Sequence, residues 1–440
     1  MNQEMYDICK WVIEKTMNNG ATDCRARMSR RRFVEIRYRD HKPEIVKEAT
    51  TRGLNLSIYV NGKYSSQNTP DLRKTTLESF IAKAVENTGF IEDDPYRSLP
   101  AKEYYTGRSD IDLHLVDPNH ENLTAEKRHQ IAKTIEQISL DKAGDKVISV
   151  EAGMNDSEWE EVILTSNGFE GNNKTTDYWA GASVTISDEG ERKPNGYFWA
   201  GSRSFDGMPS LQLIGEEAAK RTLDLTGARK IQTETLPVII ENRVVGNVLW
   251  GFLSALNGNN IQQKRSFLAD KKGETVAGKL FTIIDDPFID KGFGSRLYDS
   301  DGFPAKKRTI INEGKIEEFF IDWYYSRKLN CEPTTGGTSN LIIPPGSKSP
   351  EMLMKELGRG ILITGFIGGN SNSATGDFSI GIIGKLFENG VPVQSIAEMN
   401  IADNHLNFWN KLTAVGNDPW RFSSWLTPSL VFDDIMVSGV

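Results

Sequence analysis

One stretch decides the fold of this chain, Leu54-Asn55-Leu56-Ser57-Ile58-Tyr59-Val60-Asn61-Gly62. Apolar residues occupy every second position from Leu54 to Val60, the pattern of a strand that buries one face. Asn-Gly directly after such a strand is the strongest short-range signal for a two-residue hairpin turn. The stretch therefore predicts an antiparallel sheet.

The segments on both sides of this stretch alternate between helix and strand. Residues 5–17 carry apolar side chains at helical spacing and end at Asn18-Asn19-Gly20, which predicts an amphipathic helix with a C-terminal cap. Residues 24–38 alternate again and predict a strand. After the hairpin, Thr69 as N-cap and Pro70 at the first helical position predict a second helix ending at Gly89.

A long connection and further helices and strands complete the first half. Residues 90–122 are rich in Asp, Pro, Tyr and Asn without a period, so they predict a connection that divides this half into two subdomains. Helices are expected at 124–140 and 209–223, and strands at 147–152, 159–165, 178–186 and 197–205. A polar linker from Gly227 to Lys230 places the domain boundary near residue 228.

The second half is expected to be mostly strand. A short apolar strand at 238–240 precedes a helix at about 243–256, and Asn312-Glu313-Gly314 and Asn389-Gly390 mark later hairpins. A chain of 440 residues fits two domains. The fold class is α+β, with an N-terminal domain (1–228) of antiparallel sheet and helices and a C-terminal domain (229–440) of strands around one buried helix.

Composition indicates a soluble cytoplasmic protein. Its 52 Lys and Arg against 60 Asp and Glu, a net charge of −8, give no general reason for binding nucleic acid or a membrane. The three cysteines form neither a disulfide framework nor a CxxC pair. We find no secretory signal and no apolar run long enough for a membrane helix.

The one basic cluster lies between Arg25 and Arg39 and is interrupted by Glu35. It is expected to be the solvated face of a sheet, with a patch for nucleic acid or an acidic partner as the alternative.

The histidines exclude a helical zinc site in the second half. They are His41, His114, His120, His129 and His405, so none lies between 130 and 404, and HExxH or HExxxH cannot occur there. We expect the group at 114, 120 and 129 to be solvated loop residues, and His405 to be a surface or capping-region histidine at a helix start. No GxSxG elbow is present, and Asp285-Asp286 is interpreted as turn chemistry before Pro287.

Three stretches of the second half together resemble the TldD/PmbA family, known as proposed modulators of DNA gyrase. They run from Ser266 through Gly273-Glu274-Thr275 to Pro287, from Asp301-Gly302-Phe303-Pro304 to Leu329, and from Thr375-Gly376-Asp377 to Asp418. In the catalytic branch of that family, an HExxxH helix just before these stretches and a later cysteine hold zinc. The matching helix here, Arg243 to Leu253, contains no His and no Glu, and no cysteine follows Cys331.

The resemblance therefore implies the PmbA branch, also called TldE, with no catalytic residue, no metal ligand and no cofactor in this chain. It implies a TldD-like partner that carries the zinc, forming a two-subunit protease for unfolded peptides, without direct contact to nucleic acid. The alternative is a stand-alone homodimer that binds a peptide or protein without proteolysis.

The candidate substrate or partner surface combines a glycine-rich segment with one aromatic side chain. Glycines there would let a peptide backbone approach closely, and aromatic residues on the matching helix would fill space used by metal in the catalytic branch. The alternative is that the glycines serve only tight turns and the aromatic residues only the core. The residues of this surface are Gly368, Gly369, Asn370, Thr375, Gly376, Asp377 and Trp250.

Overall fold

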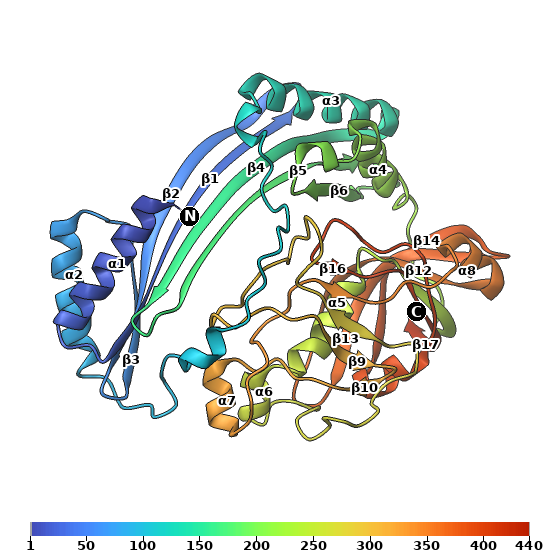
Figure 1. Cartoon of the computed structure of the whole chain (residues 1–440). Helices are drawn as coiled ribbons and strands as arrows, with labels where there is room; N and C mark the ends of the chain where they lie inside the picture. The colour runs from blue at the N-terminus through green and yellow to red at the C-terminus, as the bar shows by residue number, and fades with distance from the viewer. Residues whose placement is uncertain (1, 440) are drawn as a thin grey trace.

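The protein is described by a computed structural model covering residues 2–439, whose strands form three sheets (Figure 1). The first sheet has the strand order β3-β2-β1-β4-β5-β6 and is antiparallel throughout. The elements of this half are α1 (Gln3–Asn18), β1 (Asp23–Arg39), β2 (Lys42–Val60), β3 (Lys63–Thr69), α2 (Lys74–Thr88), α3 (Ala125–Ala143), β4 (Val147–Thr165), β5 (Glu170–Ile186), β6 (Asn195–Ser202) and α4 (Leu211–Leu223).

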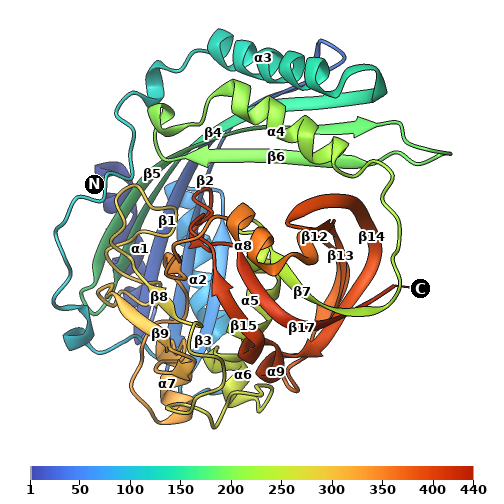
Figure 2. The same ribbon diagram turned by 90° about the vertical axis from the view of Figure 1, so that its right-hand side faces the viewer.

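Strand alternation explains the layers of this half. Even-numbered residues such as Ala26, Leu56 and Val162 are buried among α1 and α2, and Ala152 and Ala180 are buried among α3 and α4. All four helices therefore cover one face of the curved sheet. The second half of the chain lies against the opposite, concave face (Figures 1 and 2).

The stretch that opens the sequence forms the predicted hairpin. Leu54, Leu56 and Ile58 are buried in β2. Asn61 and Gly62 have φ values of 50° and 85° between β2 and β3, the left-handed backbone that a two-residue hairpin turn of this kind requires. The antiparallel sheet and the α+β class are confirmed.

Two local predictions for the first half were wrong, and one turn was not predicted. Helix α2 begins at Lys74 with Arg73 as N-cap, because Thr69 still pairs with Leu54 in the sheet. The strands expected at 147–152 and 159–165 are one strand, β4. The turn between β1 and β2, at Asp40-His41, contains no glycine although both residues have positive φ, so sequence gave no signal for it.

The second half contains two further sheets. One has the order β10-β9-β8-β11-β16, and the other has the order β14-β13-β12-β7-β17-β15 and closes on itself through β14 and β17. The strands are β7 (Glu234–Ile240), β8 (Ile283–Asp285), β9 (Arg308–Asn312), β10 (Lys315–Ile316), β11 (Leu341–Ile342), β12 (Arg359–Ser371), β13 (Asp377–Glu388), β14 (Val391–Asn404), β15 (Leu412–Val415), β16 (Trp425–Leu426) and β17 (Leu430–Ser438). The helices are α5 (Val245–Ala255), α6 (Gly258–Gln262), α7 (Trp323–Leu329), α8 (Pro350–Leu357) and α9 (His405–Phe408).

The connection between α2 and α3 joins the two halves of the molecule. It contains only short 3₁₀ turns and runs along α7. The Arg97 guanidinium lies 3.5 Å from the centre of the Tyr324 ring, and Trp323 Nε1 donates to Ser98 Oγ at 3.1 Å. This segment therefore packs on the second half of the molecule. From the sequence it was expected only to divide the first half into two subdomains.

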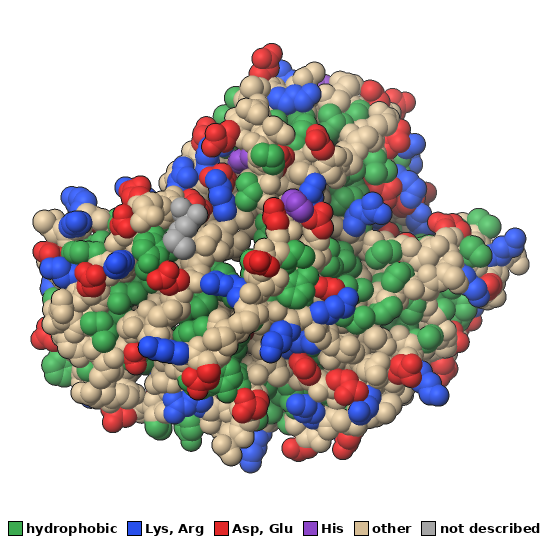
Figure 3. All heavy atoms as spheres, viewed as in Figure 1, with side chains coloured by type: hydrophobic (Ala, Val, Ile, Leu, Met, Phe, Trp, Pro, Cys, Tyr) green, Lys and Arg blue, Asp and Glu red, His purple; other side chains and the backbone are tan. Residues whose placement is uncertain are grey.

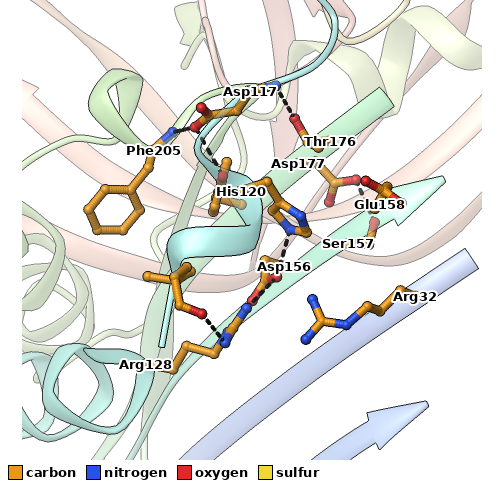
Figure 4. A network of polar contacts seen from close by, with 12 residues as sticks. Arg32, Asp117, His120, Arg128, Asp156, Ser157, Glu158, Thr176, Asp177 and Phe205 are labelled. Carbon is orange, nitrogen blue, oxygen red and sulfur yellow. Dashed lines mark hydrogen bonds and ion pairs between the residues drawn. The ribbon is translucent and has the colours of Figure 1, made fainter. Parts of the chain in front are cut away.

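The same connection is anchored at its other end by a buried polar network (Figure 4). His120 Nε2 lies 2.8 Å from Asp156 Oδ1 of β4, and Arg128 of α3 binds both oxygens of that carboxylate. Burial alone would raise the pKa of Asp156, but the hydrogen bonds from His120 and Arg128 outweigh it and leave the pKa below its usual value. The expectation that His120 is solvated was wrong, because the side chain is only 3% exposed.

The other members of the predicted histidine group are separate from His120. His114 is exposed beside Asp290, and His129 Nδ1 lies 2.9 Å from the Tyr38 hydroxyl. The group at 114, 120 and 129 does not form a cluster in space.

The cysteines are all unpaired. Cys9 and Cys24 are buried, which raises the pKa of each thiol to about 12, while Cys331 is exposed at the end of α7. Among residues 2–439, no helix is long and apolar enough to cross a membrane.

The Asp156 network predicts a large loss of stability when its carboxylate is removed. Asp156→Ala leaves Arg128 and His120 buried without an anion, so the free energy of unfolding should fall by about 3–5 kcal/mol in urea titration. The matched control is Arg30→Gln, which breaks the more exposed pair with Glu158 and should cost less than about 1 kcal/mol. Equal losses in the two variants would contradict this assignment.

Candidate functional site

Helix α5 occupies the position at which the family resemblance places the zinc-binding helix. It is predominantly buried, through residues that include Val248, Leu249 and Phe252. Asn247 and Trp250 are the exposed residues of this helix, and Trp250 leaves 62% of its surface exposed. Asn247 and Ser254 are the polar side chains of this helix, so α5 presents no imidazole, thiolate or carboxylate that could bind zinc.

His405 lies directly behind α5 and is fully buried, so of the two alternatives the surface position was wrong and the capping region was right. It is the first residue of α9, as predicted, but its ring packs against Phe267 and Phe378, at centroid distances of 5.8 and 4.9 Å. A side chain on Gly251 of α5 would meet His405 Nε2 at 2.7 Å, so only glycine fits there. Burial lowers the pKa of His405 to about 4.

Two hydrogen bonds determine the tautomer of His405. Trp409 Nε1 is a donor only, and it lies 3.2 Å from His405 Nδ1, which must therefore accept. The neutral ring then carries its proton on Nε2 and donates it to Ser371 Oγ at 2.9 Å. His405 cannot accept the Ser371 proton in this state, so the pair does not have the arrangement of a nucleophile and its general base.

A zinc ion does not fit the residues of this region. The one imidazole near α5 uses both nitrogens in hydrogen bonds, and aromatic rings surround it. Between residues 2 and 439, no group of three or more His, Cys, Asp or Glu side chains is arranged to hold a metal ion. The donor set for a zinc site of the usual composition is therefore absent from this part of the chain.

Six of the seven predicted surface residues lie in the hairpin that joins β12 and β13. Gly368, Gly369 and Asn370 are exposed at the end of β12, where the register with β13 shifts. A side chain on Gly369 would meet Ser379 O at 2.5 Å, so close packing within the chain itself requires this glycine.

The turn of this hairpin is tied to the start of α9. Asn404 Nδ2 donates to Thr375 O and to Asp377 Oδ1, both at 2.9 Å, and His405 N donates to Gly376 O at 2.8 Å. Through Ser371 and Gly251 the hairpin also reaches α5, the helix that carries Trp250. The structure thus places the hairpin next to α5.

The arginines of β1 are largely paired with carboxylates. Arg27 pairs with Glu161 and Arg32 with Glu48, and Arg37 and Arg39 share Glu151. Both signs of charge are interspersed over the face of the molecule that Figure 3 shows. The prediction of a solvated sheet face holds for the pairs of Arg32, Arg37 and Arg39, whereas Glu161, the partner of Arg27, is buried. None of these pairs forms a purely positive patch.

The pair Asp285-Asp286 is structural, as the turn interpretation predicted. Asp285 is buried and accepts hydrogen bonds from Arg308 and Ser339, whereas Asp286 Oδ1 accepts from Phe288 N in the turn that contains Pro287.

His405 predicts a specific dependence of stability on pH. The unfolded chain binds a proton at the ordinary pKa of 6.5, but the folded chain does so only near 4. As the pH drops from about 6.5 to about 4, the unfolded chain therefore binds more protons than the folded one. The free energy of unfolding should fall over this range by up to about 1.4 kcal/mol per pH unit because of this group. In His405→Gln this component is lost, so urea titrations from pH 7 to pH 4 should show the two proteins converging. Parallel pH profiles would contradict the assignment.

Comparison with known proteins identifies the family. Models of the PmbA/TldA metallopeptidase match in succession, with domain 1 at residues 24–88, the central domain at 118–226 and the C-terminal domain at 233–439. The metalloprotease PmbA of Escherichia coli O157:H7 is 25% identical over 92% of this chain and 90% of its own length.

Solved structures agree with this result. A proposed modulator of DNA gyrase from Bacteroides thetaiotaomicron VPI-5482 is 35% identical, with a TM-score of 0.96 over 99% of both chains. TldE from Thermococcus kodakarensis, at 17% identity, shares the fold with a TM-score of 0.86 over 98% of this chain and 100% of its own. The chain described above belongs to the PmbA/TldD family.

Proposed function

We propose that this chain is the non-catalytic, metal-free subunit of a two-subunit zinc metalloprotease that acts on unfolded peptides, with a TldD-like chain as the zinc-bearing partner. The observation that carries the proposal is the composition of α5 and its surroundings. Where the catalytic branch of the family places zinc ligands, this chain has Gly251 packed against a neutral His405 inside an aromatic cluster.

The remaining features support a role in shaping and partnering rather than in chemistry. Trp250 is a large exposed aromatic side chain, and such residues are enriched at protein interfaces. The net charge of −8 and the paired arginines of β1 give no basic surface for DNA, so any effect on gyrase would be indirect. We place the protein in the cytoplasm, consistent with its three unpaired cysteines.

We further propose that residues 1–228 and 229–440 are the two domains of the subunit. The first sheet lies entirely within the first range, and the other two lie entirely within the second.

A stand-alone homodimer is the second candidate, and the open edge of β2 is a surface through which it could form. β3 pairs only with Leu54–Val60, so the outer edge of β2 from Lys42 to Gly53 has no strand partner within residues 2–439. An open edge of this length is a template for pairing with another chain. Either a second copy of this chain or a catalytic partner could pair with this edge.

The first test is reconstitution. This chain and a TldD-like chain from the same organism are purified separately and together, and zinc content, mass in solution and peptidase activity are measured. We expect substoichiometric zinc and no proteolysis for this chain alone, and a zinc-containing complex that cleaves an unfolded peptide. Tight stoichiometric zinc or proteolysis by this chain alone would overturn the proposal, and a homodimer that ignores the TldD-like chain would favour the second candidate.

The second test concerns Trp250. If this side chain lies in the interface with the partner, Trp250→Ala should weaken the complex by about tenfold or more in Kd, as expected for a central aromatic residue. Its high exposure predicts a change in unfolding free energy within about 0.5 kcal/mol. Phe90→Ala is the matched control, because Phe90 is 81% exposed and follows α2 in the first half of the chain. Equal affinity for the Trp250→Ala variant and the wild type would remove Trp250 from the interface.

A further inference from the structure

A cavity of about 750 Å³ lies between the concave face of the first sheet and the second half of the molecule. Its floor is formed by side chains that share one face of the sheet, because Arg27 is opposite Ile163 in the register and Glu161 is opposite Asn173. One wall is the connection from Ile111 to Pro118, and the other is the loop from Arg296 to Ser300.

The cavity reaches an open edge of β5. β6 pairs with β5 only from Tyr178 to Thr185, so within residues 2–439 the earlier half of β5 has no neighbouring strand on that side. Thr176 N donates to Leu115 O at 3.0 Å, so the backbone of Thr176 points away from β4. Because alternate residues of a strand point the same way, the amides and carbonyls of Lys174 and Asn172 also point outward.

The outward N–H and C=O groups of Asn172 and Lys174 have no backbone partner within residues 2–439, and both residues line the cavity. Peptide groups left without partners beside a cavity are the defining feature of a site for strand addition. Each added residue advances about 3.4 Å along the strand, so roughly three residues of an extended peptide would span both positions.

The charges of the cavity indicate which peptide would bind. Arg25 bonds only to the carbonyl oxygen of Ser300, and its buried Nε has no partner. Arg296 donates to Gly337 O and forms no ion pair with a described carboxylate. The other cations are already matched, since Arg27 pairs with Glu161 and Lys174 with Glu158. Arg25 and Arg296 therefore form no ion pair within the described residues, although the lining also holds the carboxylates of Asp112 and Asp299, which a bound carboxylate would have to avoid.

Apolar and hydroxyl groups complete the lining. Ile111, Leu113 and Leu297 contribute apolar surface, and the Tyr298 hydroxyl is buried without a hydrogen-bond partner. A ligand that combines apolar side chains, a carboxylate and an unpaired backbone would satisfy all of these groups together.

We propose that this cavity binds an extended acidic peptide, which adds as a strand to the β5 edge at Asn172 and Lys174 and places a carboxylate against Arg25 and Arg296. This proposal rests on the proposed function in one respect, the choice of an unfolded peptide as the class of ligand. It adds a binding surface in the first half of the chain, far in sequence from the predicted surface on α5 and the β12–β13 hairpin.

The experiment uses the full-length chain and a fluorescent probe, fluorescein-Glu-Val-Thr-Val-Glu-amide. Two comparison probes replace its glutamates by lysines or methylate its backbone nitrogens. We expect saturable binding of the acidic probe in fluorescence polarisation, and Kd values about tenfold weaker or more for both comparison probes. Hydrogen exchange should slow at the amides of Asn172 and Lys174 when the acidic probe is bound. Equal binding of the three probes, or no change in exchange at these amides, would overturn the proposal.

Substitutions separate the edge from the charges. Lys174→Pro removes the outward N–H without touching the hydrogen bonds to β4, and should weaken the probe by about tenfold, whereas Lys174→Ala should stay within about twofold. Arg25→Gln should weaken the acidic probe several-fold, and its control is Arg52→Gln on the exposed part of β2. Circular dichroism checks that each variant is folded. The site would be contradicted if Lys174→Ala lost as much affinity as Lys174→Pro, and Arg52→Gln as much as Arg25→Gln.

The results also separate this site from the proposed function. Binding of the acidic probe by the isolated chain, without any gain in peptidase activity on mixing with a TldD-like chain, would support the site and reject the subunit role. An active complex whose first subunit fails to bind the probe would reject the site and leave the subunit role standing.

Discussion

The carboxylate of Asp156 is the interaction on which the arrangement of the first half depends. It is held by Arg128 from α3 and by His120 from the long connection, so a single buried group joins the sheet, a helix and an irregular segment. Burying one anion with two cationic or polar partners is favourable only when the geometry satisfies all of them. The preceding part of the connection, residues 111–118, hydrogen-bonds to Thr176 at the edge of β5 and forms one wall of the cavity.

Sequence predicted the parts of this fold that local patterns encode. The alternation from Leu54 to Val60 and the Asn61-Gly62 turn specify a hairpin because one face of the strand is buried and two residues must adopt positive φ. The earlier part of β2, from Lys42 to Gly53, escaped notice because it is mostly exposed on both faces and shows no period. The start of α2 was misplaced because Thr69 and Pro70 carry helix-start chemistry, while pairing with Leu54 keeps Thr69 in the sheet.

The candidate sites were harder to predict because their residues meet only in three dimensions. His405 is buried by Phe267 and Phe378, which lie on distant segments, so its sequence context of Asp403 and Asn404 suggested exposure. The cavity at β5 is built from β1, β4, β5, the connection and the loop at Tyr298, and no spacing in the chain links these parts. In contrast, the lack of zinc ligands on α5 could be read directly, since it requires only the identity of the residues along one helix.

The three thiols have a consequence for observing this protein at work. Cys9 and Cys24 are buried and held in the protonated form at neutral pH, so Cys331 alone offers an accessible sulfur. Its neighbour Glu332 accepts a hydrogen bond from Tyr104 of the connection, so this cysteine lies at the seam between the two halves. A dye attached there without any engineered mutation would report on whether the seam opens when a peptide or a second chain arrives.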